Sequence, residues 1–329
     1  MGVNGHIGCY AHTLNLIVKG SISKVSGLEE LIKSVKSVVG HFKHSIVCSD
    51  ELRKMQEIEG KIPLKLKQDV VTRWNSTYLM LDRYCSLSHF ITAIVSKLRL
   101  SIKMPSNDDI EHIRDVIKVL EPIESITREL SAEKHITISK IIPISNCLLK
   151  CLRQMKVSSK IANQLIDNLC VNTKNRLKVY EKNDFIRIGT LLDPRFKKIL
   201  FSTPELADLT VKSLSQKLND VFHSMDTDVS VSDNNHIETS SVWDFHDSVV
   251  SSQSFDGRNT HNEIAKYIQM SLIDRSNDPI HYWAKNKSVF PRLYQLALKS
   301  LNHRDIRSFR KGLLKDWYDY HQQTQSYYW

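Results

Sequence analysis

The sequence predicts a mainly α-helical protein. Its 329 residues include only 10 Gly and 8 Pro, whereas sandwiches and barrels need a turn residue every few positions. In several segments the apolar residues recur every three or four positions, as they do on the buried face of a helix. The hydrophobic content of 41% is enough for a sizeable core. We therefore expect a globular, helix-dominated fold with one large domain or two smaller ones.

The first two helices are expected over residues 25–42 and from Ser106 onward. In the first, the apolar residues that share one face are Val25, Leu28, Leu31, Ile32, Val35, Val38, Val39 and Phe42. The second begins with an S-x-x-D capping pattern, formed by Ser106 and Asp109 before an apolar run. Pro122 should kink or end this helix, because proline lacks the amide hydrogen that a helix interior uses.

Further along, residues 138–152 are apolar enough to be buried on most sides, and residues 161–180 show another helical stripe. Residues 274–301 predict a short helical segment with aromatic anchors. Between them, residues 224–262 are rich in Ser, Asp, Asn and Thr and carry seven acidic residues against one Arg. Such a composition is typical of a disordered acidic linker.

The net charge of +10 and the isoelectric point near 9.2 suit a polyanionic partner such as nucleic acid, although a basic soluble surface has the same balance. The six cysteines contain no C-x-x-C pair, which argues against a disulfide framework and a zinc ribbon. No apolar run approaches the roughly 18 residues of a membrane helix. We expect a soluble intracellular protein with no membrane partner.

Two short segments combine residue types that carry chemistry. Cys9 and His12 form a C-x-x-H pair; with His41 and His44 it would reach the four ligands of a structural zinc, but the spacing favours a packed Cys and His instead. Residues 69–78 contain the Arg73-Trp74 pair, which suits a phosphate and an unstacked base. The alternative is that the tryptophan is a core anchor beside a snorkelling arginine.

Five blocks together resemble the hAT transposases and the zinc-finger BED domain-containing proteins. They are CYAHTLNL at 9–16, DVVTRWNSTYLMLDR at 69–83, RELSAEKHITISKIIP at 128–143, GTLLDPRFK at 189–197 and DPIHYWAKNKSVFPRLYQLALKSL at 278–301. The family motif residues are Cys9, His12, Asn15, Asp69, Thr72, Asn75, Asp193, Pro194, Arg195 and Trp283. The resemblance implies an RNase H-like core interrupted by a large all-helical insertion.

The resemblance also implies DNA cleavage by three carboxylates that hold divalent metal such as Mg, and a zinc-binding BED finger. The first two acids are expected before Cys9, yet residues 1–8 contain no acid; the third is expected after Leu301, where the sequence departs from the family pattern. Asp69 and Asp193 lie in blocks to which the family assigns no catalysis. We therefore expect a chain truncated at both ends, with no catalytic residue, no metal and no cofactor, which is not an enzyme.

On this basis we expect five regions. Residues 1–50 would be a remnant of the RNase H-like α/β core, 51–223 the helical insertion, 224–262 the linker, 263–301 a helical segment and 302–329 a divergent basic and aromatic tail. Arg73 and Trp74 would contact DNA in the nucleus, with Trp74 stacking on a flipped base. Self-association is expected to be weakened, because most of the family's dimerisation region is missing. Two alternatives remain: a fragment of an active transposase with acids in flanking exons, or a scaffold for protein partners.

Overall fold

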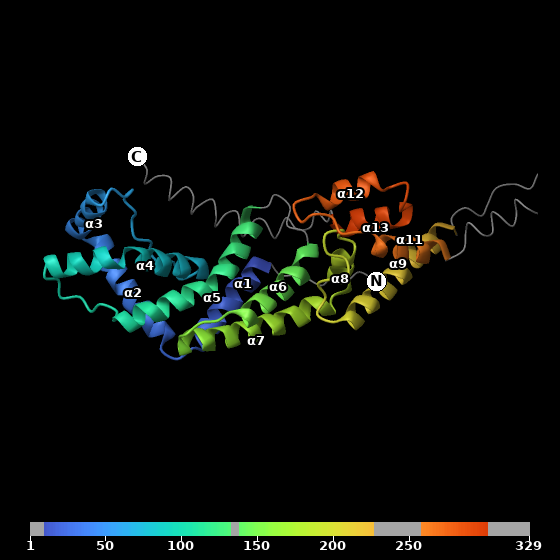
Figure 1. Cartoon of the computed structure of the whole chain (residues 1–329). Helices are drawn as coiled ribbons and strands as arrows, with labels where there is room; N and C mark the ends of the chain where they lie inside the picture. The colour runs from blue at the N-terminus through green and yellow to red at the C-terminus, as the bar shows by residue number, and fades with distance from the viewer. Residues whose placement is uncertain (1–9, 133–137, 227–257, 302–329) are drawn as a thin grey trace, which may run out of the picture. The chain divides into compact units, whose positions relative to one another are not determined.

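A computed structural model describes residues 10–132, 138–226 and 258–301 (Figure 1). All regular secondary structure in these ranges is helical, which confirms the predicted fold class. The described chain divides into two compact units. The first comprises residues 10–132 and 147–176, and the second comprises residues 138–146, 177–226 and 258–301. None of the described helices is long and apolar enough to span a membrane.

The first unit is built around one long helix. Its complete helices are α1 (Tyr10–Ile22), α2 (Leu28–His44), α3 (Ile46–Ile58), α4 (Trp74–Lys97) and α5 (Asn107–Ala132). α4 packs against each of the other four, and Figure 1 shows α2, α3 and α5 beside it. The unit also includes the end of α6 (Ile141–Gln154) and most of α7 (Lys160–Lys182). Six residues of the predicted apolar stripe form the buried face of α2, whereas Val25 precedes the helix and Ile32 is half-buried.

The start of α5 has the predicted capping arrangement. The backbone N–H of Asp109 donates to Ser106 Oγ at 3.1 Å, and the backbone N–H of Ser106 donates to Asp109 Oδ2 at 2.9 Å. The helix does not end at Pro122 but continues to Ala132. A proline inside a helix costs about 3 kcal/mol, and here the side chains on both sides of it, Leu120 and Ile123, are fully buried. Packing therefore overrides the local preference.

The second unit surrounds a short buried helix, α8 (Asp184–Leu191). α8 packs against the 3-10 turn η1 (Ile138–Lys140), against α9 (Pro204–Asp226) and against α13 (Pro291–Leu301). α11 (Arg258–Gln269) packs against α9 and α13, and α12 (Pro279–Lys285) packs against α13. Every residue of α8 from Ile186 to Leu191 is buried.

The expected regions differ from the observed units and helices, and the expected insertion at 51–223 is divided between the two units. The expected boundary at residue 50 lies inside the first unit. The expected linker is narrower at both ends, because residues 224–226 belong to α9 and residues 258–262 belong to α11. The rest of that segment and the tail at 302–329 lie outside the described residues.

Candidate nucleic-acid interface

Asp69 ties the loop before α4 to the first turn of that helix. Thr77 Oγ1 donates to Asp69 Oδ1 at 2.7 Å, and Ser76 Oγ lies 2.9 Å from the same oxygen. Lys36 Nζ, on α2, lies 3.1 Å from Asp69 Oδ2. Burial acts to raise the pKa of Asp69, but the hydrogen bonds from Thr77, Lys36 and Ser76 and the charge of Lys36 lower it below its ordinary value. Asp69 is thus an ionised, fully engaged carboxylate.

Trp74 opens α4 and occupies a core position, with 3% of its surface exposed. Its backbone N–H donates to Asn15 Oδ1 at 3.0 Å, which joins α1 to α4. Arg73 is the N-cap residue and is half-buried. In this structure Trp74 is a core anchor, which is the second of the two alternatives for the Arg73-Trp74 pair. Its ring would have to leave the core to stack on a base. The stacking role of Trp74 stays a prediction.

The other motif residues of the first unit lie in varied environments. His12 is exposed on α1, Thr72 is exposed in the loop, and Asn75 is half-buried in the first turn of α4. Cys9 lies outside the described residues, so the C-x-x-H pair is described only in part. The two histidines at the end of α2 are exposed. Within the ranges that the structure describes, no group of three or more His, Cys, Asp or Glu side chains is placed to hold a metal ion.

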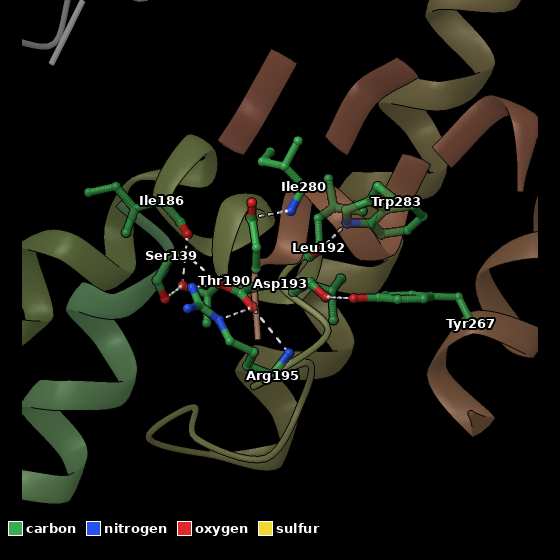
Figure 2. Close-up of polar contacts among 11 residues, drawn as sticks. Ser139, Ile186, Thr190, Leu192, Asp193, Arg195, Tyr267, Ile280 and Trp283 are labelled. Atoms are coloured by element: carbon green, nitrogen blue, oxygen red, sulfur yellow. Dashed lines mark hydrogen bonds and ion pairs between the residues drawn. The ribbon is translucent and has the colours of Figure 1, made fainter. Parts of the chain in front are cut away.

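In the second unit, Asp193 forms a buried ion pair with Arg195 (Figure 2). Arg195 Nε donates to Asp193 Oδ1 at 2.9 Å and Nη2 donates to Oδ2 at 2.7 Å, a two-pronged contact. Ser139 Oγ also donates to Oδ2 at 2.7 Å, and Asp193 has 0% exposure. Next in sequence, the carbonyl of Pro194 accepts a hydrogen bond from Ile273 N at 3.2 Å. We call Ser139, Asp193 and Arg195 the buried latch, because together they join η1 to the end of α8.

Trp283 anchors the C-terminal helices to the end of α8 (Figure 2). Trp283 Nε1 donates to the carbonyl of Leu192 at 2.8 Å, and Tyr267 Oη donates to the carbonyl of Leu191 at 3.1 Å. The two rings lie 4.9 Å apart between centroids, and both are fully buried. The last carbonyls of a helix have no partner within it, so these aromatic side chains satisfy groups that burial would otherwise leave unpaired. This confirms the predicted aromatic anchors.

The two motif acids do not fit the two-metal chemistry of the resembled enzymes. Metal ligation needs carboxylate oxygens with free lone pairs directed at a shared point. The oxygens of Asp69 are engaged by Thr77, Ser76 and Lys36, and those of Asp193 by Arg195 and Ser139. Each acid belongs to a different compact unit. We derive no metal-dependent step through them.

A group of basic residues outside the sequence motifs lies at the corner between α6 and α7. Lys150, Arg153, Lys156 and Lys160 are all exposed, and we call them the cationic corner. Among the described residues, none of the four forms an ion pair with an acidic side chain. The signal was in the sequence: residues 138–166 contain no acid at all. The net charge of the whole chain does not reveal this segment, because it averages over acidic and basic regions.

The backbone of this corner is fixed by Asp115 on α5. The N–H groups of Ser158 and Ser159 donate to Asp115 Oδ2 at 3.0 and 2.9 Å, and Lys118 Nζ lies 3.0 Å from Oδ1. Burial raises the pKa of Asp115, but the Ser159 N–H, Lys118 and the Ser158 N–H together lower it. The negative charge of Asp115 is therefore already compensated, and Asp115 orders the turn that carries Lys156 and leads to Lys160 at the start of α7.

Comparisons with known proteins agree with the five sequence blocks. The ZBED1 RNase-like helical domain matches residues 7–119. The chain is 24% identical over 310 residues to the human zinc finger BED domain-containing protein 4, covering 91% of this chain and 26% of that protein. It is 22% identical over 325 residues to the rice zinc finger BED domain-containing protein RICESLEEPER 3, covering 88% of this chain and 40% of that protein.

A transposase is also among the similar proteins. The chain is 28% identical over 211 residues to a putative AC transposase of Zea mays, covering 59% of this chain and 24% of that protein. The chain thus spans between about a quarter and two fifths of the length of these three relatives. It is similar to zinc finger BED domain-containing proteins and to a putative AC transposase, in agreement with the resemblance of the five blocks.

Proposed function

We propose that this relative of the BED zinc-finger proteins and hAT transposases binds nucleic acid through the cationic corner and does not cut it. The observation that carries the proposal is the set of four exposed cations between Lys150 and Lys160, in a segment without acids. Lysine and arginine side chains that neutralise phosphates release the counterions condensed on the nucleic acid. This release supplies most of the affinity in non-specific binding. Two similar proteins also support the proposal, because their names describe a zinc finger BED domain-containing protein and a putative AC transposase.

The corner suits a phosphate backbone better than base edges. Its cations lie on the end of α6, in the turn that follows and on the first residue of α7, and Asp115 holds the main chain of that turn in place. Lys150, Lys156 and Lys160 act as point charges, and Arg153 adds a planar fork that matches phosphate oxygens. Contacts of this kind position a duplex without reading its sequence. We therefore expect salt-sensitive binding with little sequence preference.

The test is fluorescence anisotropy of a labelled DNA duplex, titrated with the chain at several salt concentrations. Replacing all four corner cations by glutamine should weaken binding strongly and lower the slope of log K against log salt by up to about 3.6, since each phosphate contact contributes about 0.9. The matched control replaces four other exposed lysines, Lys24, Lys33, Lys43 and Lys103, and removes the same charge. Equal loss in both variants would show that only net charge matters, and would reject the corner as the site.

The proposal that the chain does not cut DNA is supported by the engagement of Asp69 and Asp193 with neighbouring donors. It is tested by incubating the purified chain with the same duplex and Mg²⁺ or Mn²⁺, and separating strands on a denaturing gel. The expected result is intact DNA. Strand cleavage that depends on the metal would overturn this part of the proposal and favour an active transposase fragment.

We place the protein in the nucleus, where a nucleic-acid-binding relative of BED zinc-finger proteins and transposases would act. A fluorescent fusion of the chain should concentrate in the nucleus of a eukaryotic cell. Exclusion from the nucleus, with the fusion intact on a blot, would contradict this placement and leave the binding test unaffected.

A further inference from the structure

Three sulfur-bearing side chains lie close together at the end of α6, two on the helix and one directly after it. Cys147 and Cys151 are four residues apart on the helix, so they are one helical turn apart and point the same way, whereas Met155 directly follows the last residue of the helix. All three line a single cavity of about 440 Å³, together with Lys150 and Gln154. Both cysteines are exposed, and Met155 is half-buried. The cavity therefore gathers the soft donor atoms of this segment.

We propose that this cavity binds one soft monovalent cation of the copper(I) type through the two thiolates, with the Met155 thioether as a third donor. The proposal does not rest on nucleic-acid binding, although Lys150 belongs both to this cavity and to the cationic corner. Soft thiolate and thioether ligands select copper(I), whereas a structural zinc needs four ligands. At (i, i+4) the two Cβ atoms are about 5–6 Å apart. One ion with metal–sulfur bonds of about 2.3 Å, the length typical of zinc thiolates, bridges sulfurs up to about 4.6 Å apart.

The surrounding charge fits this ion better than a divalent one. Binding replaces two S–H protons by one copper(I), so two protons are released and the bis-thiolate centre carries a single negative charge. Lys150 lies in the same cavity and offsets that charge. The nearby sequence has no carboxylate that hard divalent ions prefer, because residues 138–166 contain no acid.

The other described cysteines differ from this pair. Cys48 is 1% exposed. Burial raises the pKa of the Cys85 thiol to about 11 and also raises the pKa of the Cys170 thiol, so both resist forming the thiolate that metals require. Cys147 and Cys151 are the exposed pair among the described cysteines. The other cysteines can therefore serve as control positions when metal binding by Cys147 and Cys151 is tested.

The test is anaerobic titration of the full chain with copper(I) against a coloured copper(I) chelator. The chain should withhold one equivalent, and Cys147→Ser or Cys151→Ser should weaken this binding by at least about tenfold. Met155→Leu should weaken it less, because two thiolates remain. Cys170→Ser and Cys9→Ser should bind as the parent does. Equal uptake by the parent and by the double variant Cys147→Ser/Cys151→Ser would overturn the site.

Two further measurements keep the outcome decisive. Helicity by circular dichroism must be the same in all variants, which is expected because Cys147 and Cys151 are exposed. Zinc(II) should be removed by a weak chelator under conditions where copper(I) is retained; retention of zinc(II) as tight as copper(I) would overturn the choice of ion. DNA binding by the double cysteine variant should equal that of the parent, which separates this site from the proposed function of the cationic corner.

Discussion

The two motif acids, Asp69 and Asp193, occupy opposite kinds of environment. Asp69 is half-buried in the first unit, with 10% of its side chain exposed, and its lysine partner, Lys36, has 39% of its side chain exposed. Asp193 is wholly buried in the second unit, and its partner Arg195 has 7% side-chain exposure. Both aspartates hold a loop against a helix, so they have similar structural roles. The difference is the solvent around each pair.

This difference sets how much each pair should matter. In water an ion pair gains little, because solvent screens the attraction and competes for the same groups. In a dry interior, losing one partner leaves the other charge buried without compensation, which is far more costly. The comparison therefore predicts a steep contrast between equivalent substitutions in the two units.

The largest expected effect is that of Arg195→Met, which leaves the Asp193 carboxylate buried with Ser139 as its remaining side-chain donor in the latch. We expect a loss of about 3–5 kcal/mol in the local stability of the second unit. Hydrogen exchange of the α8 amides measures this directly, because local opening free energies differ between the two units. Adding Asp193→Asn should recover part of the loss, since no charge is then orphaned. A loss below about 1 kcal/mol would mean that water reaches the latch.

A second expected effect concerns Lys197, which is 3% exposed beside the latch. Its Nζ donates to the carbonyls of Tyr267 and Met270 at 2.6 and 2.5 Å, and burial lowers its pKa to about 8. Above pH 8 the folded protein has lost this proton while the unfolded chain keeps it up to about pH 10.4. The unfolded state then binds more protons, so stability should rise with pH in this window.

Between pH 8 and about 9.5, below tyrosine ionisation, the gain from Lys197 should be about 2 kcal/mol. The measurement is the pH dependence of α11 amide exchange, corrected for the intrinsic exchange rate. Lys197→Met should flatten this dependence. The same slope in parent and variant would assign it to another group.

Much of the fold could be predicted from the sequence, because the helices depend on local patterns of apolar and capping residues. The apolar stripe of α2 and the capping pair at Ser106 and Asp109 were recognised from spacing alone, and the structure has both. The continuation of α5 through Pro122 was not, since it depends on burial of the flanking side chains by other helices. Local preference predicts an element where it acts alone and fails where packing opposes it.

Less of the candidate site could be predicted from the sequence. The Arg73-Trp74 pair was found as a motif, but sequence could not decide between a core ring and an exposed one, because that depends on the contact of Trp74 with Asn15 on another helix. The latch joins residues 54 positions apart, Ser139 and Asp193. The cationic corner was readable as an acid-free stretch, but its ordered turn depends on Asp115, which lies on α5.

The smallest expected effects belong to the half-buried pair of Asp69 and Lys36, and they complete the comparison. Lys36→Met removes a half-exposed cation and should cost no more than about 1 kcal/mol. Asp69→Asn should cost about 1–2 kcal/mol, because it places an amide among the donors Thr77, Ser76 and Lys36. The lowered pKa of Asp69 means that its contribution is present above about pH 4 and is lost as pH falls through the folded pKa.

The measurement for this pair is amide exchange in the first turns of α4, at pH 7 and at acid pH. The cost of Asp69→Asn relative to the parent should shrink on acidification, because the parent's own carboxylate becomes protonated. At pH 7, the loss of local stability caused by Arg195→Met should exceed that caused by Lys36→Met by at least about 2 kcal/mol. Equal costs would show that burial does not separate the two acids, and the contrast between the units would then need another cause.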